Sequence, residues 1–204
     1  MRDQAAVVLP GTPVVTACDN LLAARARDGD RHAFEALVAR HQQSVFAYVV
    51  RLLGDRDLAD DATQEAFIAA FRSIDGFRGG HFRRWLIRIA HNKALDQLRA
   101  RRRRNASSLE RDEAPEPAAL GPEAWADRAG LTELLQAALA TLPADQRATV
   151  LLRATQDLTY DEVATVLRVD LGAVKSRLAR GRRRLRDFLS AHRELLPSDV
   201  RLDA

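Results

Sequence analysis

Two strongly basic segments contain the residues of this 204-residue chain whose types and spacing could do chemistry. Residues 78–104 carry ten basic side chains and one acidic one, and residues 175–186 carry seven basic side chains and no acidic one. Guanidinium groups bind phosphates and guanine edges through paired hydrogen bonds. Because acidic stretches separate the two segments, a general bias towards arginine does not explain them. The pattern indicates two surfaces that bind a polyanion.

The second basic segment completes a helix-turn-helix pattern. Thr159-Tyr160-Asp161-Glu162 is a capping box that predicts the start of a short helix, and a tight break at residues 169–172 precedes a longer one. Apolar residues from Val174 to Leu185 share one face of the longer helix, so its basic face points outwards. That face suits the DNA major groove, although a solvated basic helix is the alternative. The predicted DNA contacts are Lys175, Ser176, Arg177, Arg180 and Arg183.

The first basic segment differs from the second because it contains aromatic residues. Trp85 stands between Arg84 and Arg88, and Phe77 and Phe82 come just before it. Aromatic rings among cations suit the stacking of unpaired bases, which contributes about 1–3 kcal/mol per base. For Phe82 we favour a place in the core, whereas for Trp85 a core role and a base-stacking role are both open.

A helix predicted from about Leu58 to Ile74 carries an acidic face opposite its apolar side, which includes Phe67 and Phe71. The acidic face consists of Asp60, Asp61, Gln64 and Glu65. Taken alone, it indicates only a solvated helix surface.

Helices predicted along the whole chain must position these residues. Apolar residues recur at three- and four-residue steps, and no stretch alternates for long enough to predict a strand. Asp30 is a good N-cap for one long helix, and Gly54 is a good stop for it. Further helices are predicted at residues 82–102 and 131–142, with Pro143 as the first residue of the next. The expected fold class is all-α.

The composition predicts two small helical domains joined by a flexible linker. Residues 105–130 are acidic and contain three prolines, which is typical of a linker. Helical domains are expected at residues 19–104 and 131–190, and the second is the helix-turn-helix domain. We expect residues 1–18 to form a disordered arm and residues 191–204 to form a tail.

Several function classes are disfavoured by what the sequence lacks. The single cysteine, Cys18, excludes an intramolecular disulfide and a cysteine-based zinc site. The five histidines show no metal-ligand spacing, and no glycine-rich phosphate loop or nucleophile–base pair is present. We therefore expect no enzymatic activity, no metal and no cofactor. No apolar run approaches the length of a membrane helix, and no signal peptide is recognisable, so we expect a cytoplasmic protein without membrane insertion.

The string from Phe82 to Arg99, FRRWLIRIAHNKALDQLR, resembles the promoter-melting segment of the extracytoplasmic-function (ECF) sigma factors of the sigma-70 family. The preceding helix matches the DxxQExF signature of that family at Asp61, Gln64, Glu65 and Phe67. The helix-turn-helix region matches at Leu142-Pro143, Arg147, Glu162-Val163-Ala164 and residues 172–177. The resemblance covers residues 21–104 and 131–187 in the order of the family.

Three positions depart from the family pattern. Ile87 stands where the family often has tyrosine, and Ala173 replaces a frequent threonine. The loop at residues 76–81 is short, and in this family that loop captures an unpaired promoter base.

The resemblance implies an initiation subunit that brings bacterial core RNA polymerase to promoters and helps to open the DNA. The acidic face at residues 60–65 would contact the coiled-coil clamp of the largest polymerase subunit, and the helix-turn-helix would contact the minus-thirty-five element. The linker would occupy the RNA path of the polymerase. We expect the free chain to be a monomer and an anti-sigma factor to be a further partner. The implied minus-ten and melting contacts are Arg78, His81, Arg84, Trp85, Arg88, Asn92 and Arg99.

Two alternatives belong to other function classes. A stand-alone helix-turn-helix regulator, with an N-terminal sensing or dimerisation domain, would bind duplex DNA tightly without polymerase. A nuclease would need paired carboxylates placed for metal, and Asp60 and Asp61 on an open helix face are poor candidates.

Overall fold

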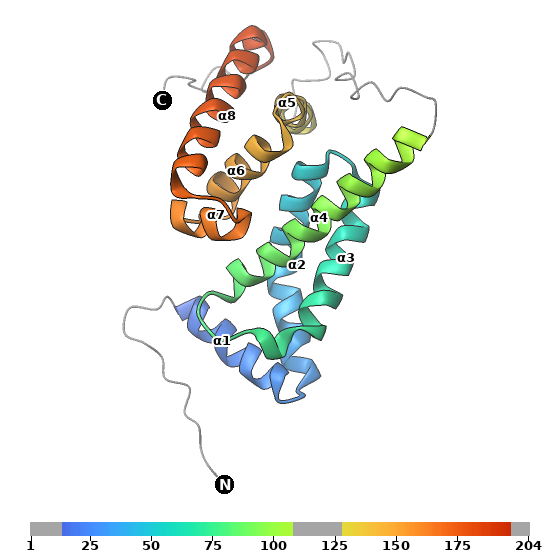
Figure 1. Cartoon of the computed structure of the whole chain (residues 1–204), viewed down its shortest axis with the longest axis vertical. Helices are drawn as coiled ribbons and strands as arrows, with labels where there is room; N and C mark the ends of the chain where they lie inside the picture. The colour runs from blue at the N-terminus through green and yellow to red at the C-terminus, as the bar shows by residue number, and fades with distance from the viewer. Residues whose placement is uncertain (1–13, 108–127, 197–204) are drawn as a thin grey trace.

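The computed structural model of the protein describes residues 14–107 and 128–196, and every regular element in these ranges is a helix. The predicted all-α class is therefore confirmed for this part of the chain. Residues 1–13, most of the predicted linker and residues 197–204 lie outside the described residues. Figure 1 shows the N-terminal helices α1–α4 packed beside the C-terminal helices α5–α8.

The N-terminal domain contains α1 (Val14–Arg27), α2 (Arg31–Leu53), α3 (Arg56–Arg72), the short 3-10 helix Ile74–Gly76 and α4 (Phe82–Ser107). The predicted ends of α2 are confirmed. The Asp30 side chain accepts from the Ala33 N–H at 3.1 Å, and Gly54 has the left-handed φ of 70° and donates to the Val50 carbonyl at 2.8 Å. Side-chain caps and a left-handed glycine satisfy backbone groups that the helix itself leaves open.

The core of this domain lies between α2, α3 and α4. The largest fully buried side chains there include Tyr48, Leu52, Phe82, Leu86 and Ile87. The expectation that Phe82 belongs to the core is confirmed, because only 1% of it is exposed.

The predicted helix at residues 58–74 needs two corrections. It runs instead from Arg56 to Arg72, because Asp55 caps it by accepting from the Leu58 N–H. Phe71, predicted on the apolar side, is 43% exposed and makes an edge-to-face contact with Phe34.

The first helix was not predicted, and it shortens the expected disordered arm. Residues 14–18 belong to α1, which continues to Arg27. Asp19 fixes this helix to α2, since its buried carboxylate pairs with Arg40 and lies 2.9 Å from Nε2 of His41. Both partners of Asp19 are more than twenty residues away in sequence, so a local pattern could not show the contact.

A buried polar pair connects α2 to α4. The Tyr48 hydroxyl and Nδ1 of His91 share a hydrogen bond of 2.9 Å, and both side chains are buried. Burial raises the pKa of Tyr48 and lowers the pKa of His91 to about 4. At neutral pH the pair is therefore uncharged, as a low-dielectric core requires.

The C-terminal domain contains α5 (Arg128–Ala140), α6 (Ala144–Thr155), α7 (Tyr160–Leu167) and α8 (Leu171–Ala191). The predicted capping box is confirmed, because Thr159 and Glu162 satisfy each other's backbone N–H groups. The turn after α7 is tighter than the predicted break: Arg168 is left-handed and Asp170 already caps α8. Pro143 is the N-cap of α6 rather than its first residue.

A close approach of α6 and α8 holds the helix-turn-helix together. Gly181 lies at the crossing, where an added Cβ would come within 2.8 Å of Cγ2 of Val150. That distance is too short for any side chain, so glycine sets the spacing of the two helices.

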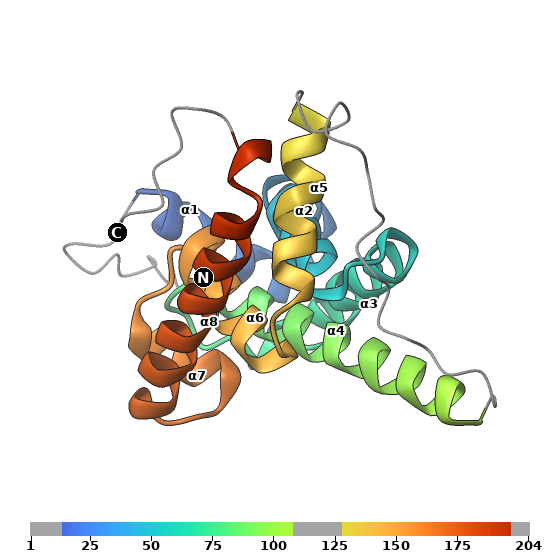
Figure 2. The ribbon, with the colours of Figure 1, turned by 90° about the horizontal axis from the view of Figure 1, so that it is seen from above.

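The two domains share an interface. In Figures 1 and 2, α6 lies beside α2 and α7 lies beside the N-terminal part of α4, whereas the C-terminal end of α4 extends away from both. Arg147 of α6 donates to the Leu52 carbonyl at 3.0 Å, and buried apolar side chains of both domains form one continuous core. The sequence predicted two domains but not this contact between them.

Candidate nucleic-acid interface

The outward face of α8 is open in the described structure. Val174, Leu178 and Gly181 are buried against the other helices of the domain. Four predicted DNA contacts lie on the opposite side and are exposed, namely Lys175, Ser176, Arg180 and Arg183. Within the described ranges, none of these four side chains has an ion pair or a hydrogen bond, so all four could contact DNA.

Arg177 differs from the other predicted contacts on α8. Its side chain is 25% exposed, and its Nε lies 3.2 Å from Oδ2 of Asp145 at the start of α6. The structure therefore places Arg177 at the α6–α8 contact rather than on the open face.

A second basic site surrounds the loop between α3 and α4. The rings of Phe77, Phe82 and Trp85 form a cluster in which each pair of centroids is 5.5 Å apart. Trp85 is half-buried and packs against the core, so it supports the core and also presents ring surface to a neighbouring pocket. That pocket of about 260 Å³ is lined by Gly76, Phe77, Arg78, Gly79, His81, Arg84, Trp85 and Arg88, together with Thr165 and Val166 of α7.

The structure thus gathers five of the seven predicted minus-ten residues around one pocket. They are Arg78, His81, Arg84, Trp85 and Arg88. Asn92 and Arg99 lie further along α4 and are exposed, and Arg99 pairs with Asp96 on the same helix. An aromatic wall next to several guanidinium groups suits an unstacked base and its phosphate.

The four residues of the acidic face are all exposed on α3, but they divide between two sides. Glu65 faces α4, where its carboxylate lies 3.4 Å from Nζ of Lys93. Asp60 and Gln64 instead line a groove of about 540 Å³ between α2 and α3. The apolar lining of this groove consists of Val38, Phe46, Phe67 and Ile68.

The apolar part of this groove was not predicted from the sequence. Ile68 is 43% exposed, and Phe46 lies under the guanidinium of Arg56 at 5.3 Å from its ring centroid. These positions come together only when α2 packs on α3, although Phe67 already belonged to the DxxQExF match. An acidic edge beside an exposed apolar floor has the composition of a protein-binding site.

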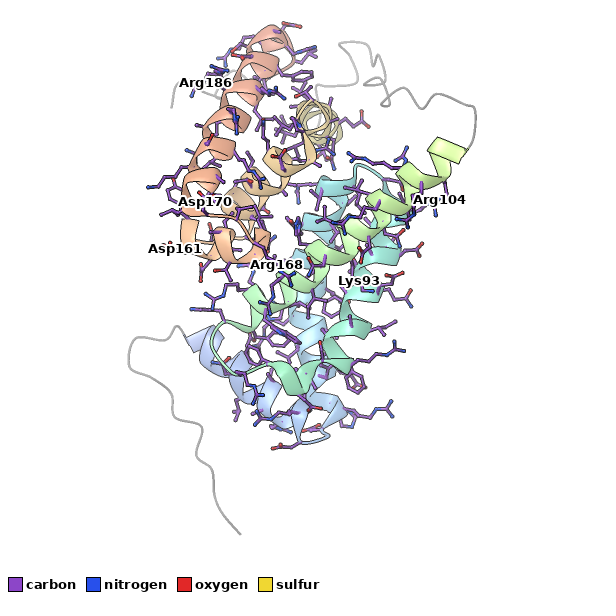
Figure 3. The ribbon with its side chains drawn as sticks, in the orientation of Figure 1. Lys93, Arg104, Asp161, Arg168, Asp170 and Arg186 are labelled. Atoms are coloured by element: carbon purple, nitrogen blue, oxygen red, sulfur yellow. The ribbon has the colours of Figure 1, made fainter. Side chains whose placement is uncertain are left out.

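Figure 3 shows that the C-terminal ends of the two basic helices, α4 and α8, point to different sides of the molecule. Arg104, near the end of α4, and Arg186, near the end of α8, lie on opposite sides of the molecule.

Among the described residues, no group of three histidine, cysteine, aspartate or glutamate side chains could hold a metal ion. No helix in these ranges is long and apolar enough to cross a membrane.

Comparison with known proteins identifies both domains. Residues 37–104 match the family model for sigma-70 region 2, and residues 132–185 match the model for sigma-70 region 4. The fold and the two matches define the class: the chain belongs to the sigma-70 family of transcription initiation factors.

Similar proteins of known name indicate which group of the sigma-70 family the chain belongs to. SigE, an ECF RNA polymerase sigma factor of Mycolicibacterium smegmatis, is 40% identical over 168 residues, which cover 80% of this chain and 65% of that protein. The sigma-H factor of Pseudomonas aeruginosa and the ECF sigma-E factor of Escherichia coli are each 36% identical, and each alignment covers 80% of this chain and 90% of the relative.

Solved structures agree with these relatives. CnrH, solved in complex with the cytosolic domain of CnrY, matches with a TM-score of 0.63 and 29% identity over 85% of this chain and 98% of CnrH. The sigma factor RpoE of Bartonella quintana, solved with the anti-sigma factor NepR, matches with a TM-score of 0.63 and 26% identity over 77% of this chain and 96% of RpoE. The chain is therefore an alternative sigma factor of the ECF group, which directs RNA polymerase to promoters, and a stand-alone regulator is not favoured.

Proposed function

We propose a division of labour among three surfaces of the chain during promoter recognition. The α2–α3 groove binds core RNA polymerase, the outward face of α8 binds the minus-thirty-five element, and the pocket at the α3–α4 loop binds the opened minus-ten element. The observation that carries this proposal is that one chain presents an acidic, apolar-floored groove and two separate basic surfaces. Residues 19–104 and 131–190 are the domains that we assign to these tasks.

The polymerase surface follows from the chemistry of the groove. Asp60 and Gln64 supply a polar edge, and Phe46, Phe67 and Ile68 supply apolar area that water would otherwise cover. A helix with a basic edge and an apolar stripe, such as those of a coiled coil, would complement both parts. Asp61 and Glu65 lie on the same helix and extend the negative charge.

The two DNA surfaces suit two states of DNA. The outward face of α8 presents exposed cations on one helix and no aromatic residue among them, which suits the major groove of a duplex. The α3–α4 site has an aromatic cluster next to cations, which suits bases that have left the stack. A protein that must bind a duplex and also hold an opened strand needs both kinds of surface.

The polymerase surface can be tested by charge reversal. We expect the double variant Asp60→Arg/Asp61→Arg, which reverses the charge at the acidic edge of the groove, to weaken assembly with bacterial core polymerase at least about tenfold, since opposed charges become like charges across the interface. The matched control Asp75→Arg/Glu133→Arg makes the same change of charge at exposed positions outside the groove. Co-purification and promoter-directed transcription are the measurements. Equal assembly of both variants would contradict the proposed surface.

Three further properties follow from the proposed role. The chain performs no covalent chemistry, it acts in the cytoplasm where polymerase and promoters meet, and it is a monomer when free. CnrH and RpoE were solved with CnrY and the anti-sigma factor NepR, which supports an anti-sigma protein as a partner of this chain too. A pull-down of that partner with the intact chain tests this point.

A further inference from the structure

A second pocket lies on the other side of the loop that borders the minus-ten pocket. This second cavity, the α1 pocket, has a volume of about 180 Å³. Phe77, Arg78 and Gly79 line both cavities, so this stretch of the loop is the wall between them. The opposite wall is α1, which runs beside the loop in Figure 1 and contacts the 3-10 helix that precedes it.

An unsatisfied hydrogen-bond acceptor belongs to the α1 pocket. Oδ1 of Asn20 is buried, and no group in the described ranges donates to it. Buried polar atoms are nearly always hydrogen-bonded, because losing water without gaining a partner is unfavourable. Since Asn20 lines the pocket, a ligand that places an N–H group there would satisfy this oxygen.

The contacts of a neighbouring residue hold Asn20 in this position. The buried carboxylate of Asp19 pairs with Arg40 and lies 2.9 Å from Nε2 of His41. Both partners belong to α2, so α1 cannot rotate about its axis without breaking these contacts. One turn beyond Asn20, the small side chain of Ala24 also lines the pocket and leaves its space open. The acceptor is therefore fixed before any ligand binds.

Two cations border the α1 pocket. Arg27, in the last turn of α1, and Arg78, in the loop, are both exposed and both line the cavity. Within the described ranges neither guanidinium has an ion pair or a hydrogen bond, and no acidic side chain lines the pocket. Guanidinium groups bind phosphates through paired hydrogen bonds. The pocket thus combines a buried acceptor, an apolar wall at Phe77 and cations that suit an anionic group.

We propose that the α1 pocket binds a second unpaired base of the DNA strand whose neighbouring base enters the minus-ten pocket. An unpaired nucleotide offers a flat ring to Phe77, an N–H group to Oδ1 of Asn20 and a phosphate to Arg27 or Arg78. The amino groups of cytosine and adenine are suitable donors, whereas thymine has no amino group. A strand that crosses the loop would then have one base on each side of it. This inference rests on the proposed function of the minus-ten pocket.

The test titrates the full chain with two labelled single strands, oligo(dC) and oligo(dT) of equal length, at one fixed salt concentration. Both strands carry the same phosphates, so the ratio of the two affinities reports contacts to the bases. Asn20→Leu removes the acceptor and keeps a side chain of similar size that favours a helix. We expect this variant to lower the preference for oligo(dC) at least about threefold, as the loss of one hydrogen bond predicts.

Two further variants keep the test valid if Asn20→Leu unfolds. Ala24→Leu fills the α1 pocket and should lower the preference for oligo(dC) in the same way, whereas Ala36→Leu makes the same change at an exposed position of α2 outside the pocket. Arg27→Ala should weaken the binding of both strands at least about twofold more than Arg31→Ala, which removes an exposed arginine outside the pocket.

The inference is overturned if the wild-type chain has no preference for oligo(dC), or if a folded Asn20→Leu or Ala24→Leu chain keeps the wild-type ratio. Displacement of oligo(dC) by free dCMP at equal nucleotide concentration would show a site for free nucleotides and would also overturn it. Arg88→Ala, on the minus-ten side of the loop, tests the proposed function separately. Weaker binding of both strands at an unchanged ratio would support that function, and wild-type affinity would count against it.

Discussion

The two basic helices of this sigma factor, α4 and α8, are both rich in arginine, but their arginine side chains have different surroundings. On α8, Lys175, Arg180 and Arg183 are exposed and make no ion pair within the described ranges. On α4, Arg83 and Arg84 are partly buried and are held by Gln156 and Glu162 of the other domain. Arginine content therefore marks a candidate polyanion surface, whereas the neighbours of each arginine decide whether that surface is free.

The cores of the two domains differ in a second way. The N-terminal domain buries two histidines, His41 and His91, with polar partners. In the described part of the C-terminal domain the one histidine, His192, stands at the end of α8 outside the core. The two domains should therefore respond differently to acid.

The largest predicted effect is the loss of stability of the N-terminal domain in acid. Burial lowers the pKa of His91 to about 4, and burial also lowers the pKa of His41. A histidine with a depressed folded pKa contributes stability above its unfolded pKa of about 6.5, and loses it as the pH falls towards the folded pKa. For His91 the loss over that window is about 3 kcal/mol, from the shift of the pKa.

Denaturant unfolding at pH 7.5 and pH 5, followed by Trp85 fluorescence in a Trp125→Phe chain, measures about 2 kcal/mol of this loss, because pH 5 still lies above the folded pKa of His91. We expect the variant His91→Gln to flatten the pH dependence, since glutamine does not titrate. If acid destabilised the C-terminal domain but left the unfolding reported by Trp85 unchanged, the predicted difference between the two domains would be wrong.

The next effect concerns Trp85, whose two roles the structure combines. Because it is half-buried in the ring cluster, Trp85→Ala should cost about 2 kcal/mol of unfolding free energy, less than a fully buried tryptophan. Trp85→Phe keeps a ring in the cluster and is the matched control. Trp85→Ala should also slow promoter opening by the holoenzyme, measured by permanganate reactivity of unpaired thymines. A stable alanine variant that opens promoters at the wild-type rate would remove Trp85 from DNA opening.

A smaller effect separates two kinds of arginine on α8. Lys175→Ala and Arg180→Ala should each cost about 1–3 kcal/mol of discrimination between a promoter and a scrambled upstream element, if the side chain contacts a base edge. Arg177→Ala should change discrimination less and should lower the stability of the C-terminal domain by at most about 1 kcal/mol, because it loses a partly exposed ion pair with Asp145. Equal effects of Arg177→Ala and Arg180→Ala on discrimination would contradict the structural role of Arg177 at the α6–α8 contact.

The sequence could predict what depends on near neighbours. The caps at Asp30, Gly54 and Thr159–Glu162 involve groups within four residues of one another, and the motifs of the sigma-70 family also lie in short strings. The outward residues of α8 followed from its helical period, apart from Arg177. These features are set by local hydrogen bonds and helix geometry.

What the sequence could not predict depends on distant partners. Arg84 and Glu162 are 78 residues apart, and each belonged to a different motif, so neither pattern showed that they pair. The start of α1 was missed because Asp19 gains its partners from α2. Ile68 and Phe46 become a groove only when two helices pack. In each case the missing information was the arrangement of helices in space.

The distance between the two domains in solution reports whether α7 lies against the minus-ten pocket. In a Cys18→Ser chain, the exposed residues Asp75, next to the minus-ten pocket, and Asp161, next to Glu162 of α7, can be replaced by cysteine and labelled with a fluorescent donor and acceptor. We predict high energy transfer in the free chain and a clear fall when core polymerase is added, because α7 must leave the minus-ten pocket before opened DNA can enter it. Equal transfer in the free chain and in a holoenzyme that transcribes from a promoter would show that the two domains do not separate when the minus-ten pocket receives opened DNA.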